Sequence, residues 1–349
     1  MTTNENRTTA LSLPQAPPRP RSLRAGLRRA LFGIDPRETT FARRGFHAPG
    51  DEAGPVRERL ERVGATFVRG YHAALEEERP EPLAARIDAE VEREFRGFAY
   101  EGAGMALALL DTLLPGRRDR LARFLAGPGE PQTYIIYVGA GWVMARLPVS
   151  PERYLSRLAD PVTDPIMRWL ALDGFGFHEG FFHASRSVAR QEVPRRLRGH
   201  RGYFRRGFDQ GLGRSLWFVE GADVGRLPRT IGAFPASRQP DLWSGLGLAC
   251  GYAGGRTRSE VESLRAAAGP FAPQLAQGVA FAAKARQRAG NPAAHTELAC
   301  RVICGCSAEE AAAVTDEALH DLPSDRPDEP AFEVWRRRIQ DHFSSGSPA

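Results

Sequence analysis

The sequence predicts an all-α protein: a helical array with internal repeats and with glycine on the packed helix faces. Residues 174–181 are Gly-Phe-Gly-Phe-His-Glu-Gly-Phe, and residues 245–252 repeat the pattern as Gly-Leu-Gly-Leu-Ala-Cys-Gly-Tyr. A looser third copy occupies residues 97–102. Internal repetition of this kind is typical of repeat architectures. Because Gly176 and Gly180, like Gly247 and Gly251, are four residues apart, each pair shares a helix face where another backbone can approach closely.

The second glycine segment also resembles the first helix of a tetratricopeptide repeat. Trp243, Leu246 and Gly247 fit the pattern Trp-x2-Leu-Gly-x2-Tyr. Cys250 replaces the final aromatic residue, and the glycine segments are unevenly spaced. The sequence therefore predicts repeats that are only loosely tetratricopeptide-like.

The N-terminal region divides into two parts. Residues 1–21 are rich in Thr, Pro and Arg without periodicity, which predicts a disordered tail. Residues 22–55 are predicted to form a basic amphipathic helix and a linker, because four apolar residues recur on one helical face: Leu23, Leu27, Leu31 and Ile34. Such a helix docks on the protein's own core or attaches to an anionic membrane or a partner, and both alternatives stay open.

Helical patterns dominate from Val56 onward and predict two halves, 56–160 and 161–322. The tripeptide Arg-Leu-Pro ends an apolar run at 146–148 and again at 226–228, so the halves resemble tandem copies. Residues 134–138, Tyr-Ile-Ile-Tyr-Val, fit either a strand or a buried helix, and we expect a helix because the corresponding run, 215–224, has helical spacing. The acidic and then serine-rich residues 323–349 predict a flexible tail.

Composition and charge exclude several classes of protein. The chain has 349 residues, 42% of them hydrophobic, which is enough for a substantial core. Its net charge is +6, but Lys284 is the only lysine, and this arginine bias is typical of a high-GC bacterial genome. The arginines form no continuous stripe and are not interleaved with aromatic residues, so we expect no nucleic-acid partner.

The sequence also predicts the cellular compartment of the protein. The first residues lack the apolar core of a signal peptide, and the longest apolar stretches, 102–114 and 134–147, are shorter than the roughly 20 residues of a membrane-spanning helix. Three of the four cysteines are crowded at 300, 304 and 306, which suits a reducing compartment. We therefore expect a cytoplasmic protein, with peripheral membrane contact through Leu23–Ile34 as a further possibility.

The candidate catalytic residues lie in the glycine segment richest in aromatic residues. His178 and Glu179 begin like the zinc-protease motif His-Glu-x-x-His, but Phe182 stands at the fifth position and the motif fails. Glu179 and His183, one turn apart, can pass a proton, hold a metal or simply form a hydrogen bond. We predict that Glu179, His183 and His178 are catalytic, together with Glu101, which takes the place of Glu179 in the first copy.

If the repeated segments surround one cavity, further residues converge there as candidate substrate contacts: Phe175, Phe177, Phe181, Asp209, Glu220 and Asp223. The alternative is that the acidic members form ion pairs with the many arginines. None of the candidate glutamates, Glu101, Glu179 and Glu220, is followed by a histidine three residues later, and the cysteine spacing departs from that of iron–sulfur sites, so the sequence predicts no metal. Phosphate loops and dinucleotide fingerprints are missing, and the cofactor stays unknown.

Several segments resemble a known family. Residues 33–46, from Gly-Ile-Asp-Pro to Arg-Gly-Phe, and residues 67–71 look like the opening of a bacterial family of unknown function encoded in enediyne polyketide gene clusters. Residues 174–181, 207–211 and 218–223 resemble it as well. The resemblance implies membership of a pathway with an iterative polyketide synthase, a thioesterase and an integral membrane protein, in which a linear polyene becomes the enediyne core. It supplies no established catalytic residues.

Two hypotheses of function follow. In the first, the chain is an accessory protein of enediyne core biosynthesis that binds, and acts on or presents, a polyene between its helices. In the second, it is a non-catalytic helical scaffold that tethers the synthase or a membrane partner. An enclosed apolar tunnel with Glu179 and His183 at its wall favours the first, and a solid core with an open groove favours the second. Whether the protein is an enzyme is left open.

Overall fold

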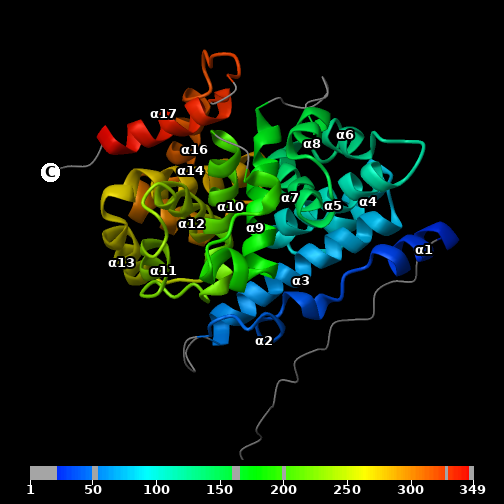
Figure 1. Ribbon diagram of the computed structural model, residues 1–349, viewed down its shortest axis with the longest axis horizontal. Coiled ribbons are helices and arrows are strands. Elements are labelled where there is room, and N and C mark those ends of the chain that lie inside the picture. Colours follow the sequence, from blue (N-terminus) through cyan, green and yellow to red (C-terminus); the bar gives the residue numbers. More distant parts are fainter. Residues whose placement is uncertain (1–21, 49–53, 159–165, 199–201, 327–328, 346–349) are drawn as a thin grey trace, which may run out of the picture.

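Every element in the described part of the computed structural model is a helix (Figure 1). The predicted all-α array is therefore confirmed. The predicted disordered tail, 1–21, lies outside the described residues, which are 22–48, 54–158, 166–198, 202–326 and 329–345.

Within these residues, seven helices form the body of the molecule as one row, each packed on the next. In order they are α3 (Gly54–Glu76), α5 (Arg96–Leu113), α7 (Thr133–Arg146), α9 (Leu170–Phe182), α10 (Tyr203–Val219), α12 (Gln239–Ala253) and α14 (Ala272–Arg288). The remaining helices cover the row: α1 (Leu23–Phe32), α2 (Phe41–Arg44), α4 (Pro80–Glu90), α6 (Arg120–Leu125), α8 (Pro151–Leu158), α11 (Leu227–Gly232), α13 (Arg258–Ala268), α15 (Ala294–Ala299), α16 (Ala308–Glu317) and α17 (Ala331–Ser345).

The five inner helices of the row share the pattern Gly-x-Gly. Residues i and i+2 point about 200° apart on an α-helix, so one glycine faces the preceding helix and the other faces the following helix. The outer helices α3 and α14 contribute one glycine each, Gly70 and Gly278. The inner pairs are Gly102 and Gly104, Gly139 and Gly141, Gly174 and Gly176, Gly211 and Gly213, and Gly245 and Gly247.

These glycines meet in reciprocal pairs. A Cβ added to Gly174 would lie 1.9 Å from the carbonyl oxygen of Val138, and one added to Gly141 would lie 2.0 Å from that of Ala171. Each glycine thus faces the carbonyl three residues before its partner glycine. The same relation holds at each interface of the row: Gly70 with Gly102, Gly104 with Gly139, Gly141 with Gly174, Gly176 with Gly211, Gly213 with Gly245 and Gly247 with Gly278.

The close approach explains why glycine is used inside helices, where it costs about 1 kcal/mol relative to alanine. Only a residue without Cβ lets a neighbouring carbonyl come this near, in a geometry that suits weak Cα–H···O contacts. The prediction of glycine-faced packing is confirmed. Gly180 and Gly251 also lie at helix contacts, against Ser215 and Ala282.

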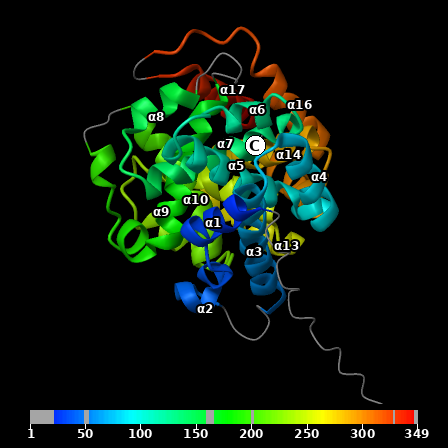
Figure 2. The ribbon, with the colours of Figure 1, turned by 90° about the vertical axis from the view of Figure 1, so that its right-hand side faces the viewer.

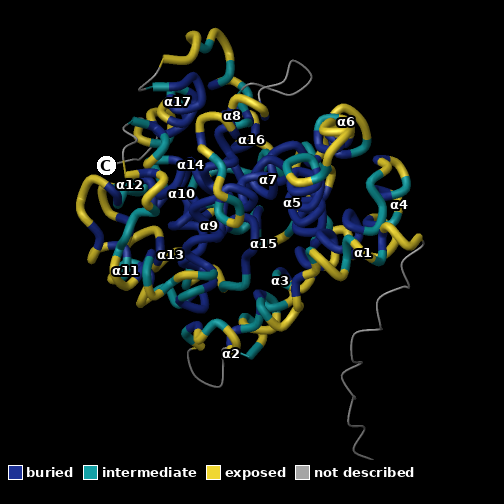
Figure 3. Tube along the Cα trace, turned by 45° about the vertical axis from the view of Figure 1, so that its right-hand side comes forward, coloured by how far each residue is buried: buried dark blue, intermediate teal, exposed yellow. Residues whose placement is uncertain are grey.

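Residues 134–138, the possible strand, lie in α7 and are helical. Residues 133–144 are all buried, so the helix has no solvent-facing side and no amphipathic period (Figure 3). The row continues from α7 to α9, which lies beyond the predicted boundary between the halves at residue 160. The tetratricopeptide-like character of the repeats stays a prediction.

The row curves so that its early and late helices meet. The rings of Phe98 in α5 and Tyr252 in α12 are 5.2 Å apart between centroids. Arg59 Nε donates to the carbonyl of Ala253 at 2.6 Å, and Arg286 Nη1 donates to that of Glu94 at 3.2 Å. These contacts bring six helices of the row around one apolar space.

Helix α1 lies on the outside of α3 and faces the viewer in Figure 2. Its arginines bind α3 and the residues that follow it: Arg29 Nη1 is 2.9 Å from Glu76, and Arg28 Nη2 is 3.1 Å from Glu78. Its leucines point outward, and the exposed fractions of Leu23, Leu27 and Leu31 are 95%, 61% and 65%. The helix therefore docks through its polar face and leaves its apolar face uncovered in the described structure.

The C-terminal segment differs from the sequence-based expectation. Residues 323–349 were predicted as a flexible tail, but 331–345 form α17, which packs on α14 and α16 (Figure 1). Trp335 is fully buried and its indole N–H donates to the carbonyl of Thr315 at 2.8 Å. The prediction is wrong here because four apolar residues, spaced at helical intervals, are separated by charged and polar ones: Phe332, Trp335, Ile339 and Phe343.

None of the helices described has the combination of length and apolar character that a membrane span requires.

The glycine pairs predict a large difference between two similar substitutions. Gly174→Ala places a methyl group 1.9 Å from a backbone oxygen, and separating α7 from α9 should lower the free energy of unfolding by about 1–3 kcal/mol. Gly232→Ala, also helical but with nothing within 4 Å of the added Cβ, should leave it unchanged or raise it by up to about 1 kcal/mol. Urea unfolding followed by circular dichroism measures both, and equal stabilities would contradict the role of the glycine pairs.

Candidate functional site

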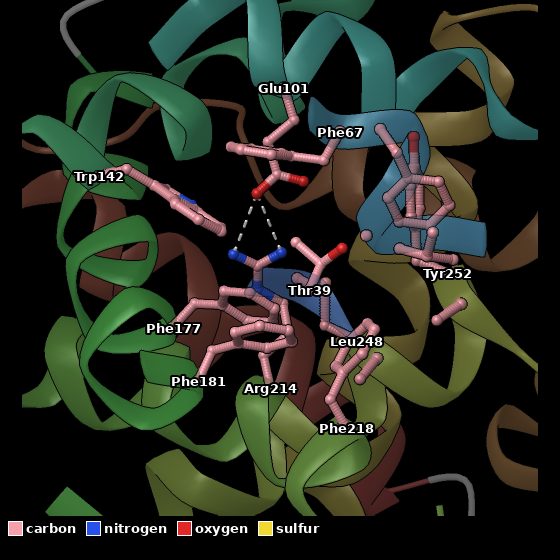
Figure 4. Close-up of a pocket in the computed structure, with 15 residues that line it drawn as sticks. Thr39, Phe67, Glu101, Trp142, Phe177, Phe181, Arg214, Phe218, Leu248 and Tyr252 are labelled. Carbon is pink, nitrogen blue, oxygen red and sulfur yellow. Dashed lines mark hydrogen bonds and ion pairs between the residues drawn. The ribbon is translucent and has the colours of Figure 1, made fainter. Parts of the chain in front are cut away.

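Six helices of the row, with the short helix η1 (Pro36–Thr39), surround an apolar cavity (Figure 4). Its wall is mainly aromatic and leaves about 500 Å³ of empty space, open solvent included. The aromatic residues are Phe67, Phe98, Trp142, Phe177, Phe181, Phe218 and Tyr252. Smaller side chains complete the wall: Thr39, Val63, Gly64, Leu248, Ala249 and Ala253.

Two charged side chains line this cavity, Glu101 from α5 and Arg214 from α10. Glu101 Oε1 lies 3.5 Å from both terminal nitrogens of Arg214, as the dashed lines in Figure 4 show. Arg214 Nε lies 2.8 Å from Asp173 Oδ1, and Gln210 donates to the other oxygen of Asp173 at 3.0 Å. The guanidinium also lies 4.3 Å from the centroid of the Phe177 ring. One buried arginine thus bridges two buried carboxyl groups.

The glycine contacts hold these polar residues in place. The carbonyl of Glu101 is packed against Gly139, and that of Asp173 against Gly211. Arg214 directly follows Gly213, which is packed against α12. The polar side chains therefore extend from the most closely packed backbone of the row, a rigid support of the kind that functional sites need.

Burial raises the pKa of the Glu101 carboxyl to about 7. The Arg214 guanidinium partly offsets the effect of burial, and the charge of Asp173 adds to it. Near neutral pH, protonated and ionised forms of Glu101 are both populated, the condition in which a carboxyl group best donates or accepts a proton. Glu101 is thus the member of the predicted catalytic set that lies in the cavity.

The predicted aromatic contacts divide between two faces of α9. Phe177 and Phe181 line the cavity and stack on each other, with ring centroids 5.6 Å apart. Phe175 lies on another face, where its ring packs edge-on against Phe208 at 5.4 Å. Phe175 therefore belongs to the core between α9 and α10.

The predicted acidic contacts do not converge on the cavity. Asp209 forms a buried ion pair with Arg238, whose Nη2 lies 2.5 Å away. Glu220 accepts hydrogen bonds from Arg226 and Thr230, both at 2.8 Å. Asp223 lies 3.4 Å from His47 and accepts from the backbone of Gly225 at 2.9 Å. Asp209 and Glu220 therefore form ion pairs with arginines, as in the alternative interpretation of the sequence, whereas Asp223 pairs with a histidine.

His178, Glu179 and His183 form a cluster of their own at the C-terminal end of α9, outside the cavity lining. Glu179 Oε1 lies 3.6 Å from His183 Nδ1 and 4.0 Å from His178 Nδ1. Trp142 stands between this cluster and the cavity, since its ring contacts both His178 and Phe177, at 5.4 and 5.5 Å between centroids. Among the described residues, this is the group whose ligating atoms, within 4.8 Å of one another, could hold a metal ion.

The cysteines offer no comparable site in the described structure. All four are free thiols, and burial raises the pKa of Cys250 to about 12 and that of Cys306 to about 11. Such thiols stay protonated at neutral pH and are poor nucleophiles.

Sequence reasoning missed Asp173, Arg214, Trp142 and Tyr252. Asp173 and Arg214 carry a recognisable signal, because each is a charged residue within a helical segment whose nearest neighbours are apolar or small. Such a residue requires a buried partner. The identity of that partner depends on which helices become neighbours, and the sequence alone does not fix this.

The helices that form the cavity lie within the range of a single family model, which matches residues 23–343. The chain belongs to the family described as protein of unknown function (DUF1702). The DUF1702 match runs from the first residue of α1 into α17 and so includes the cavity and the histidine cluster. No curated protein and no solved structure matches the chain.

The buried carboxyl of Glu101 predicts a specific pH dependence. Its pKa in the folded protein, about 7, lies above the ordinary 4.5, so its contribution to stability is complete below pH 4.5 and is lost as pH rises through 7. The difference in free energy of unfolding between wild type and Glu101→Gln should change by about 3 kcal/mol over this interval, in favour of the glutamine variant at high pH. Denaturant titrations of both proteins from pH 4 to 8 measure it, and parallel profiles would contradict the assignment.

Proposed function

We propose that the chain binds an elongated apolar small molecule in the aromatic cavity and acts as an accessory protein of enediyne core biosynthesis. The observation that carries the proposal is the cavity itself, with seven aromatic side chains and one buried carboxyl–guanidinium pair. The resemblance to the enediyne-cluster family suggests the ligand class, a linear conjugated polyene.

The wall of the cavity suits such a ligand. Apolar pockets with a few fixed polar groups are typical of small-molecule sites. The rings come from six helices and are packed on one another, for example Phe67 on Trp142 at 4.2 Å between centroids. A polyene between such rings keeps its π-faces in contact with aromatic surface and away from water.

The Glu101–Arg214 pair supplies the charged groups that a ligand in the cavity would meet. Arg214 offers positive charge to a polar end of the ligand, and Glu101 offers a group that can exchange a proton at neutral pH. An aromatic cavity with this buried pair supports the ligand-binding proposal over the scaffold proposal. Glu179 and His183 do not line the cavity, and the proposal assigns the catalytic role expected of them to Glu101.

The proposal predicts saturable binding of a conjugated probe. Parinaric acid, a polyene whose fluorescence rises in apolar surroundings, should bind the purified protein with one molecule per chain. Leu248→Trp, which adds bulk at a partly exposed position of the lining, should weaken binding at least about tenfold, or 1.4 kcal/mol. In a producing strain from which the gene is deleted, this variant should fail to restore enediyne production and should accumulate polyene intermediates.

Leu319→Trp provides the control, because Leu319 is also partly buried but does not line the cavity. It should bind the probe and restore production like the wild type. Equal probe affinity for wild type and Leu248→Trp would exclude the cavity as the binding site. Normal production by the deletion strain would exclude the pathway role.

We also propose that α1 attaches the protein to an anionic membrane surface. The helix contains three arginines and no acidic residue, and its exposed leucines are spaced four residues apart. Arg28 and Arg29 are paired with α3 and its C-terminal flank, so Arg24 is the arginine most available to lipid headgroups. Arg24 contributes about 1 kcal/mol near a charged surface, whereas each inserted leucine contributes about 1.5–3 kcal/mol.

Vesicle flotation tests this attachment. The protein should float with phosphatidylserine-containing vesicles more than with phosphatidylcholine vesicles, and Leu27→Asn with Leu31→Asn should abolish flotation. Leu113→Asn changes an exposed leucine of α5 and should have no effect. Absence of flotation by the wild type, or flotation insensitive to the double substitution, would reject the lipid as the partner of α1.

A further inference from the structure

The histidine cluster at the end of α9 is a second candidate site, separate from the cavity. Glu179 lies in the last turn of α9, and His183 is the residue at which the helix ends. The backbone N–H of His183 still donates to the carbonyl of Glu179 at 3.0 Å, and His183 Nδ1 lies 3.6 Å from Glu179 Oε1. His178, one residue before Glu179, brings its Nδ1 to the same carboxylate oxygen.

His178 is the decisive member of this cluster. Its side chain is 95% buried, and neither ring nitrogen has a hydrogen-bond partner in the described structure. The aromatic rings of Trp142 and Phe182 clamp the imidazole, at 5.4 and 4.7 Å between centroids, and hold Nδ1 4.0 Å from Glu179 Oε1. A buried polar group without a partner is costly, and a ligand at Nδ1 would remove the cost.

The carboxylate of Glu179 is oriented for the same ligand. Its Oε2 binds Arg186 Nη2 at 2.5 Å, which leaves Oε1 facing the two histidines. Outer contacts of this kind fix the orientation of metal ligands. His183 is 44% exposed, so the cluster is open to solvent on one side.

We propose that His178, Glu179 and His183 bind a divalent transition-metal ion through two imidazole nitrogens and one carboxylate oxygen. One ligating atom from each lies within 4.8 Å of the others, so small side-chain movements bring all three to the 2.0–2.2 Å that zinc requires. Imidazole with carboxylate suits zinc, iron, nickel and copper, and three protein ligands leave positions open for water or substrate. The sequence-based expectation of no metal rested on a missing motif, whereas this set comes from the helix end.

Two cationic groups oppose the ion. Arg186 holds the far oxygen of Glu179, and Arg146 acts electrostatically on His178. Both lower the affinity for a cation, and Arg186 does so while it orients the carboxylate. Removal of the Arg186 charge should therefore change the affinity without removing a ligand, which distinguishes a metal site from a simple ion pair.

The test uses untagged full-length protein that has been freed of metal with a chelator. Zn²⁺ is titrated in competition with a chromophoric chelator, and Co²⁺ reports the ligand type in its absorption spectrum. We expect one ion per chain, with affinity at least about tenfold lower in His178→Ala, Glu179→Gln and His183→Ala, since loss of even outer-shell partners costs 10–100-fold. His320→Ala, an exposed histidine elsewhere, should bind like the wild type. Arg186→Gln should bind more tightly, because the glutamine amide can still donate to Glu179 Oε2 while the positive charge near the ion is removed.

If His178→Ala does not fold, His183→Ala still decides, because its side chain is partly exposed and its removal disturbs no core packing. Equal affinities for His183→Ala and His320→Ala would overturn the proposal. A thiolate-to-cobalt charge-transfer band would do the same, because it would place the ion at the cysteines. The metal proposal does not depend on the polyene proposed for the cavity, so either can fail alone.

Discussion

The close contact between a helical glycine and a carbonyl of the next helix is the constraint on which this structure depends. It recurs in both directions at each interface of the described row, always between a glycine and the residue three positions before its partner. Side chains would hold the helices further apart. The contact therefore sets helix spacing and relative position together, and it fixes where the backbone at Glu101 and Asp173 lies.

The fixed backbone positions a group of buried charges whose desolvation is energetically unfavourable. Burying Arg214 with two carboxyl groups carries a desolvation penalty that its ion pairs only partly offset, and an apolar substitute is often as stable. Stability is thus a poor explanation for the buried trio, of which Glu101 and Arg214 line the aromatic cavity, and the trio is consistent with the proposed binding function. The unpartnered His178 behind Trp142 has the same character, since a phenylalanine there would satisfy the packing without leaving nitrogens unbonded.

The sequence predicted the helical class and the packed glycines because both depend on local spacing. It did not predict that each inner helix contacts two neighbours through glycine. The prediction of packed glycines rested on glycines at i and i+4, whereas the pairs at i and i+2 link the helices. Glu101 was found from its position in the repeat, and Phe177 and Phe181 were found from the aromatic, glycine-rich segment that contains them. Arg214 was not, because its pairing with Glu101 joins residues 113 positions apart. Helix α17 was missed because charged residues mask its apolar ones.

The outer helices α3 and α14 each have one glycine in contact with a neighbouring helix of the row, and the row ends at these two helices. On α3 and α14 the remaining surface is taken by other helices, α1 and α16 among them, rather than by a further unit of the row. An inner helix, by contrast, presents the same kind of contact on both sides, so a duplicated segment could enter the row without altering its neighbours. Because nearly every helix of the row adds to the cavity wall, the number of Gly-x-Gly segments sets the circumference of the cavity. Gene duplication would then change the size of ligand that such a protein can enclose.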